Sequence, residues 1–215
     1  MIRILSSTIS ASDKILPGDL STCKVFPNIR QYDQDNKQIL SLIGHLLCEK
    51  MFFDMQLPKT LLDTLHQNKF GKWQFSSSSI HFNISHSNNT VIAAVCDKGI
   101  VGIDIEWIRT IAISDFRSCY SDNEWTTIQQ ADNVPQIFFD LWTKKESLLK
   151  AWGMGLQIPL NNVIVEGFQG SAPAHNISGY FTSLHIPEYS CNLCTTFKAN
   201  EVEIDEVEIE EILFK

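Results

Sequence analysis

Two carboxylates, Asp104 and Glu106, stand close together in the segment Val101-Gly-Ile-Asp-Ile-Glu106. The segment alternates in the manner of a strand, so Gly102 and both acids share one face while the aliphatic residues occupy the other. Neighbouring carboxylates provide the hard oxygen ligands that Mg²⁺ prefers alongside water and substrate phosphates. A solvated strand face has the same pattern, so the spacing alone leaves a metal site and a plain surface both open.

A further acid and a lysine follow in the run Trp142-Thr-Lys-Lys-Glu-Ser-Leu-Leu-Lys150, whose pattern predicts a helix. Glu146 and Lys150 are one helical turn apart and therefore share a helix face. Such a pair suits a divalent metal and a phosphate, although it is also the pattern of an ordinary surface ion pair. A third polar segment, Phe82-Asn-Ile-Ser-His-Ser87, comes just before an expected strand at 90–96.

In this order, the three segments resemble the motifs of the Sfp-type 4'-phosphopantetheinyl transferases. That family carries Phe-Asn-Ile-Ser-His-Ser, then Gly-Ile-Asp-Ile-Glu, then Trp-x-x-Lys-Glu-x-x-x-Lys-x-x-Gly-x-Gly. This chain has all three blocks with matching spacing, at Phe82–Ser87, Gly102–Glu106 and Trp142–Gly155. The resemblance is specific because three independent motifs occur in the family's order.

The resemblance implies a reaction. A serine of a carrier protein attacks the β-phosphate of coenzyme A, takes up phosphopantetheine and releases adenosine 3',5'-bisphosphate. Asp104, Glu106 and Glu146 would hold Mg²⁺, which polarises the pyrophosphate. Lys150 would stabilise charge on the phosphate as a compact cation. Glu146, or a water that it holds, would accept the serine proton.

The same resemblance implies which residues contact coenzyme A: Lys72, Ser85, His86, Lys145 and Lys150. The chain departs from the family pattern at two places. Trp73 stands where the family usually has a proline after Gly-Lys, and the expected helix at 36–50 lacks the arginines that many members direct at a coenzyme A phosphate. Arg30, Lys37 or Lys50 could take their place.

The family's architecture implies an α+β fold of two similar lobes, each a small antiparallel sheet with a helix, related by a pseudo-two-fold axis. The expected lobes are residues 1–106 and 107–215, with the active site between them. Because one chain would then supply a complete site, we expect an active monomer.

Periodicity and turn signals predict the individual elements. Asp97-Lys-Gly99 has the composition of a hairpin turn, and Ser121-Asp-Asn-Glu124 that of a capping box that begins a helix. The alternation of acidic and aliphatic residues at 201–213 predicts an edge strand and a short end helix. The predicted helices are 36–55 and 135–152, and the other predicted strands are 1–9, 80–84, 90–96, 100–107, 162–168, 179–185 and 190–199.

The bulk properties narrow the class of protein. The chain has 215 residues, 44% of them hydrophobic, and a formal net charge of −8, which argues against a nucleic-acid partner. No apolar run is long enough for a membrane span, and the N-terminus becomes polar too early for a secretory signal, so we expect a cytoplasmic protein with no membrane partner. Cys191-x-x-Cys194 is better explained by reduced cysteines in or beside a strand than by a zinc site.

Three functions compete. A 4'-phosphopantetheinyl transferase (holo-[acyl-carrier-protein] synthase) is favoured. A non-catalytic homologue that binds a carrier protein would have no need of all four residues Asp104, Glu106, Glu146 and Lys150. A metal-dependent nucleotide phosphohydrolase would use a positioned water in place of a carrier.

The segment Ile111–Tyr120, with Arg117, matches the position of the family's carrier-docking region. A loop and helix that pack on the second lobe explain the segment equally well. The carrier could serve fatty-acid, polyketide or non-ribosomal peptide synthesis.

Overall fold

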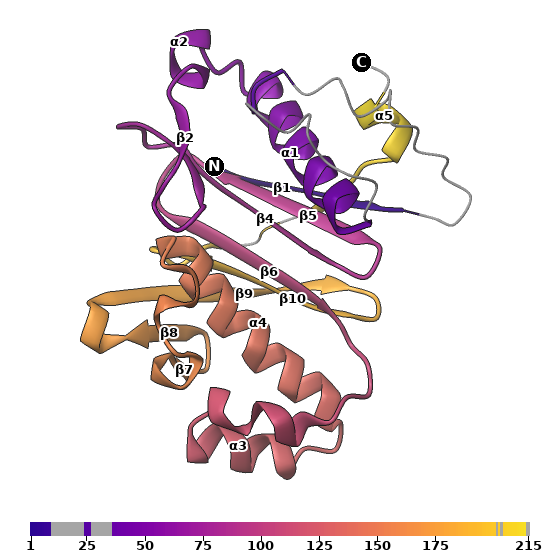
Figure 1. The fold of residues 1–215 in the computed structure, drawn as a ribbon, viewed down its shortest axis with the longest axis vertical. Helices are drawn as coiled ribbons and strands as arrows, with labels where there is room; N and C mark the ends of the chain where they lie inside the picture. Colours follow the sequence, from indigo (N-terminus) through magenta and orange to yellow (C-terminus); the bar gives the residue numbers. More distant parts are fainter. Residues whose placement is uncertain (10–23, 27–35, 201, 203, 214–215) are drawn as a thin grey trace. The chain divides into compact units, whose positions relative to one another are not determined.

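A computed structural model describes residues 1–9, 24–26, 36–200, 202 and 204–213. The chain forms two compact units, the first comprising Met1–Gly99 with Val202–Lys215 and the second Ile100–Glu201. Both units combine helices with mostly antiparallel strands, so the predicted α+β class is confirmed (Figure 1). Across the described residues, no helix has the length and apolar character needed to span a membrane.

The first unit has a four-stranded sheet in the order β11-β1-β5-β4. Its strands are β1 (Ile2–Thr8), β4 (His81–Ser87), β5 (Thr90–Cys96) and β11 (Ile204–Glu206). The pair β1–β11 is parallel and the other pairs are antiparallel. Every residue of β5 is buried, as expected for a strand with neighbours on both sides.

The predicted hairpin at Asp97–Gly99 is wrong. β5 pairs with β1 and β4, whereas the next strand, β6 (Val101–Trp107), pairs with β10 (Tyr189–Thr195). The hairpin that does form joins β4 to β5, and Asn88 in its turn has a φ of 54°. Asparagine tolerates this left-handed conformation better than most residues.

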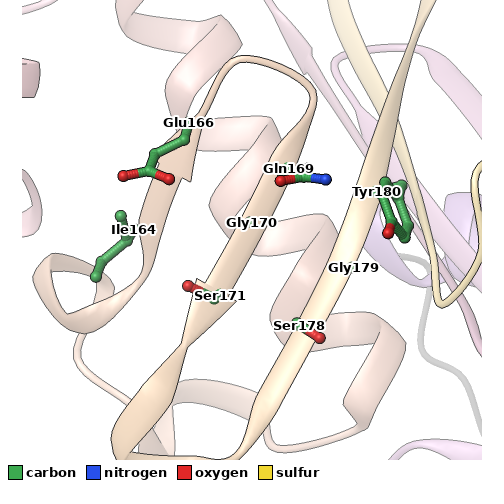
Figure 2. A pocket seen from close by; sticks show the side chains of 8 residues that line it. All are labelled: Ile164, Glu166, Gln169, Gly170, Ser171, Ser178, Gly179 and Tyr180. Carbon is green, nitrogen blue, oxygen red and sulfur yellow. The ribbon is translucent and has the colours of Figure 1, made fainter.

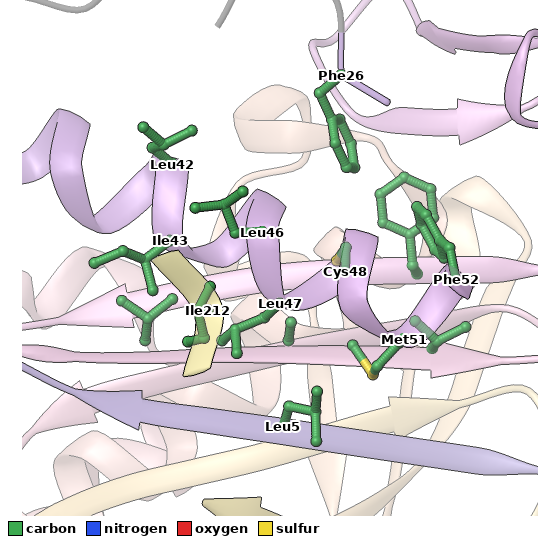
Figure 3. Packing of buried hydrophobic residues seen from close by; sticks show 14 of the residues in the cluster. Leu5, Phe26, Leu42, Ile43, Leu46, Leu47, Cys48, Met51, Phe52 and Ile212 are labelled. Atoms are coloured by element: carbon green, nitrogen blue, oxygen red, sulfur yellow. The ribbon is translucent and has the colours of Figure 1, made fainter. Parts of the chain in front are cut away.

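Helix α1 (Asn36–Asp54) covers the sheet of the first unit and contributes more residues to its core than any other element. Leu47, Met51 and Phe52 are fully buried there, and Ile212 of helix α5 (Ile209–Leu213) packs into the same cluster (Figure 3). The end helix therefore belongs to the first unit. The remaining elements of the first unit are α2 (Lys59–Leu62), β2 (Leu65–Gln67) and β3 (Trp73–Phe75).

The second unit has a five-stranded antiparallel sheet in the order β6-β10-β9-β8-β7. Helix α4 (Val134–Trp152) lies along this sheet, and the shorter α3 (Asp122–Gln129) packs against α4 (Figure 1). The other elements of the unit are the strands β7 (Ile164–Glu166), β8 (Gln169–Ala172) and β9 (Ile177–Ile186) and the 3₁₀ turns η3 (Ile113–Cys119), η4 (Gly155–Gln157), η5 (Leu160–Asn162) and η6 (Pro173–His175).

Local signals predicted the helix ends of this unit correctly. The Ser121 and Glu124 side chains form the predicted capping box at the start of α3. In α4, the side chain of Asn133 caps the first turn, and Gly153 ends the helix with a φ of 63°. Glycine adopts this left-handed conformation without the steric cost that a Cβ would bring.

The observed units divide the chain differently from the expected lobes 1–106 and 107–215. Strand β6 belongs to the sheet of the second unit, and the tail from Val202 onward belongs to the first. The tail does contain the predicted strand and end helix, but the strand pairs with β1. The pseudo-two-fold relation between lobes stays an expectation.

Candidate active site

A glycine allows the backbone of α4 to lie directly against β6. A Cβ on Gly102 would lie 2.1 Å from the carbonyl oxygen of Ser147 and 2.3 Å from the amide nitrogen of Ala151. No side chain fits in that space. Gly102 therefore faces α4, and Asp104 faces the same helix two residues further on, as the strand pattern predicted.

Asp104 and Lys150 form an ion pair across this contact. The Nζ of Lys150 donates to the Oδ1 of Asp104 over 2.5 Å. Asp104 is only 3% exposed, whereas the side chain of Lys150 remains 29% exposed. A buried carboxylate needs such a partner because burial of an uncompensated charge is costly. The side chain of Lys150 is therefore partly accessible from solvent.

Glu146 adds a second carboxylate from α4. Burial, and then the negative charge of Asp104, raise the pKa of Glu146 to about 7; Lys150 opposes this shift and Glu106 adds to it. Asp104, Lys150 and Glu106 therefore all lie within electrostatic reach of Glu146. Glu106 is partly exposed, and its Oε2 lies 3.6 Å from the Nη1 of Arg109. The structure thus brings together the four residues predicted to carry the chemistry.

Asp104, Glu106 and Glu146 are all carboxylates, and carboxylate oxygens are the type of ligand that a hard divalent cation prefers. Repulsion from the other two carboxylates contributes to the raised pKa of Glu146, and a cation would relieve that repulsion. Within the part of the chain that is described, however, no three His, Cys, Asp or Glu side chains are arranged so that they could hold a metal ion. The metal-binding role of these three acids stays a prediction.

Lys145 lies away from these groups, which differs from the prediction that it contacts coenzyme A. Its side chain is fully buried, and its Nζ donates to the Oε2 of Glu124 over 2.8 Å. Successive residues of a helix point about 100° apart, so the neighbour of Glu146 in sequence faces another part of the unit. The sequence does not indicate the partner of this ammonium, because the contact with Glu124 arises from the packing of α3 onto α4.

Ser85 and His86 belong to the first unit, on strand β4. The predicted strand at 80–84 extends further than expected, to Ser87, so both residues are strand residues with side chains on opposite faces. Ser85 is 5% exposed and His86 is half-buried. Their contact with coenzyme A stays a prediction.

Lys72 follows a tight turn that its own neighbours shape. The Oδ1 of Asn68 accepts a hydrogen bond of 3.0 Å from the backbone amide of Lys72, and Gly71 has a φ of 87°. Burial, and then the positive charge of Lys72, lower the pKa of His81 on β4. The lysine therefore lies near the sheet that carries Ser85 and His86.

The two departures from the family pattern lie in the same unit. Trp73 packs its ring edge-to-face on Phe26, with the ring centroids 5.5 Å apart. Lys50 is 3.4 Å from Asp54 in a surface ion pair. Arg30 and the side chain of Lys37 lie outside the described residues.

The segment proposed for carrier docking is largely packed within the second unit. Ile111, Ile113 and Phe116 are partly buried against a cluster that includes Phe138. Arg117 donates to the backbone oxygen of Tyr120 over 2.8 Å and pairs with Asp122. These contacts support the alternative interpretation of a packed loop and helix, although the guanidinium remains partly exposed.

Two features of the second unit were not predicted. A buried polar network joins α4 to the sheet: the Nδ2 of Asn192 donates to the Oγ1 of Thr143 over 2.8 Å, and Thr143 and Ser190 exchange a hydrogen bond of 3.0 Å. A cavity of about 480 Å³ lies beside this network, lined by Trp107, Asp140 and Ser190 among others. The pairing of Asn192 with Asp104 across β10 and β6 would have indicated that the polar network lies beside the candidate site. The sequence does not reveal that these two strands pair.

A smaller hollow, of about 230 Å³, lies on the outer strands of the same sheet (Figure 2). The cross-strand pair Gly170 and Gly179 lies in its floor, and Glu166, Ser171 and Tyr180 lie around it. No charged pair or cluster of acids like that of Asp104 and Lys150 occurs among the residues that line it. The five described cysteines are all free, and Cys191 and Cys194 lie in strand β10.

Comparison with known proteins agrees with this site. Residues 100–195 match the model of the 4'-phosphopantetheinyl transferase superfamily, a range that falls within the second unit and contains Asp104, Glu106, Glu146 and Lys150. The 4'-phosphopantetheinyl transferase gsp of Aneurinibacillus migulanus is 32% identical over 181 residues, which cover 80% of this chain and 75% of the relative. The 4'-phosphopantetheinyl transferase Sfp of Bacillus subtilis is 31% identical over 141 residues, or 62% of each chain. The chain therefore belongs to the 4'-phosphopantetheinyl transferase family.

Proposed function

We propose that this protein transfers the 4'-phosphopantetheine group of coenzyme A to a serine of an acyl or peptidyl carrier protein. The observation that carries the proposal is the grouping of Asp104, Glu106, Glu146 and Lys150 where α4 lies against β6. A protein that only binds carrier proteins would have no use for a partly exposed lysine held on a buried carboxylate beside a second acid. The family to which the chain belongs supports the same activity.

Each residue has a role that follows from its surroundings. Glu146, or a water that it holds, can accept the proton of the attacking serine. Lys150 can place its positive charge beside a phosphate oxygen and so stabilise the charge that develops on the phosphate. Asp104 holds Lys150 in place until the phosphate arrives.

Mg²⁺ would be held by Asp104, Glu106 and Glu146. When bound, the ion would neutralise charge on the pyrophosphate and so favour attack at the β-phosphate. Lys72, Ser85 and His86 would contact coenzyme A, and the protein would be active as a monomer.

The experiment that tests the function is mass spectrometry of an apo carrier protein incubated with this protein, coenzyme A and Mg²⁺. We expect the carrier to gain one phosphopantetheine group. A carrier that binds without a change in mass would indicate a non-catalytic homologue, and cleavage of coenzyme A without labelling would indicate a phosphohydrolase.

Asp104→Ala should abolish the labelling while the protein stays folded. Asp132→Ala, which removes an exposed acid between α3 and α4, is the matched control and should label normally. Near-normal turnover of Asp104→Ala at saturating Mg²⁺ would contradict the assignment of Asp104.

A further inference from the structure

Lys145 is a charged side chain for which the proposed chemistry has no use, and it is fully buried. Its Nζ lies 2.8 Å from the Oε2 of Glu124, 2.9 Å from the backbone oxygens of both Leu160 and Val163, and 3.2 Å from that of Cys119. An ammonium group has three protons, so four acceptors satisfy it completely. A lysine this well coordinated is held in one position.

The four acceptors come from separate pieces of the second unit. Cys119 ends η3, Glu124 belongs to the capping box of α3, and Leu160 and Val163 follow α4 at η5. One cation in the middle of α4 therefore binds the segment before the helix and the segment after it. The rotation of α4 about its own axis is set at this point.

That rotation decides where the reacting groups lie, because Glu146 and Lys150 are on the same helix as Lys145. Side-chain ends lie about 5 to 6 Å from a helix axis, so a rotation of about 20° moves them by about 2 Å. The bond from Lys150 to Asp104 is 2.5 Å long and would not survive such a movement. Misplacement of catalytic groups by about 1 Å can reduce a rate by about 100-fold.

We propose that Lys145 is a positioning residue for the transfer reaction: its bonds to three backbone carbonyls fix the rotation of α4 and thereby direct Glu146 and Lys150 at Asp104. The inference rests on the proposed function. Lys145 also connects α4 to Cys119, which belongs to the segment considered for carrier docking. Because loss of Lys145 would free the rotation of α4, it would displace Glu146 and Lys150 from Asp104 without removing either residue.

A purely stabilising role has to be separated from a positioning role. Removal of one partner of a buried ion pair is costly because it leaves an uncompensated charge, whereas replacement of both partners by neutral groups is often tolerated. Lys145→Met leaves Glu124 buried without its cation. The double variant Lys145→Met with Glu124→Gln removes the charge as well, and glutamine still serves a capping box.

The test compares the wild type, Lys145→Met, the double variant and Lys144→Met. Lys144 is the neighbouring lysine, which pairs with Asp140 one turn away, so its substitution is a matched control. For each protein we would measure the thermal unfolding midpoint, the labelling rate of an apo carrier corrected for the folded fraction, and Mn²⁺ binding without coenzyme A or carrier. Mn²⁺ binding reports on the acids independently of turnover.

We expect Lys145→Met to lower both the midpoint and the labelling rate. The double variant should recover most of the midpoint, yet label at least 10-fold more slowly than wild type and bind Mn²⁺ several-fold more weakly. Lys144→Met should match the wild type in labelling and in Mn²⁺ binding.

Two results would overturn the proposal. Recovery of labelling together with the midpoint in the double variant would mean that Lys145 only stabilises the fold. Failure of the double variant to fold would mean that the fold itself requires the carbonyl bonds. Absence of labelling by the wild type would instead refute the proposed function, so the two failures are distinguishable.

Discussion

Replacement of Gly102 by alanine tests whether the contact between β6 and α4 builds the site. The added Cβ would lie 2.1 Å from the carbonyl oxygen of Ser147, whereas ordinary contacts begin at 3.4 Å. The strand and the helix would have to separate by about 1.3 Å, because the three nearest atoms all belong to the backbone of Ser147 and Ala151, which no side-chain rotation can move. Overpacking of this kind costs about 1 to 3 kcal/mol of unfolding free energy.

The same separation would lengthen the 2.5 Å bond between Lys150 and Asp104 beyond hydrogen-bonding range. We therefore expect Gly102→Ala to lower the unfolding free energy and to reduce the rate of carrier labelling by about 100-fold per folded molecule. Urea unfolding and single-turnover labelling by mass spectrometry would measure the two effects separately.

Gly170→Ala is the matched control for this prediction. Its Cβ would also collide, at 2.3 Å, but with the ring of Phe181, which is a side chain on β9 and not the backbone of α4. We expect Gly170→Ala to destabilise the second unit while labelling per folded molecule stays near the wild-type rate. Equal labelling by Gly102→Ala and Gly170→Ala would refute the reasoning.

Three further predictions follow from single residues. Lys150→Ala should lower kcat about 100-fold or more while KM for coenzyme A changes little, because its charge acts on the transition state; steady-state kinetics with a raised KM and unchanged kcat would indicate ground-state binding instead. Arg117→Glu should raise KM for the carrier and leave KM for coenzyme A nearly unchanged; carrier kinetics that do not change at low and moderate salt would place docking elsewhere. Burial lowers the pKa of His45 to about 4 from its ordinary value of 6.5, so the unfolded state binds more protons and the unfolding free energy should fall as pH drops from about 6.5 to 4, by at most about 3 kcal/mol. Urea unfolding of the wild type and His45→Leu at pH 7 and 5 would detect this. An equal change of unfolding free energy between the two pH values in both proteins would contradict it.

The sequence by itself determined the features that depend on near neighbours. The capping box of Ser121 and Glu124 and the end of α4 at Gly153 are set by hydrogen bonds within a few residues, and both were predicted correctly. The shared face of Gly102 and Asp104 follows from the period of a strand. The family was recognised in the same way, because its motifs are short runs of residues with fixed spacing.

Tertiary structure decided what depends on distant segments. The strand that follows Asp97–Gly99 pairs with β10 and not with β5, and the C-terminal strand pairs with β1. Lys145 and Glu146 are neighbours in a motif, yet Lys145 is buried on the carbonyls of Leu160 and Val163. Strand pairing and burial arise from contacts between residues far apart in the chain, and those contacts leave no local pattern. The sequence therefore predicted which groups carry the chemistry, and the packing of α4 decided which of them meet Asp104.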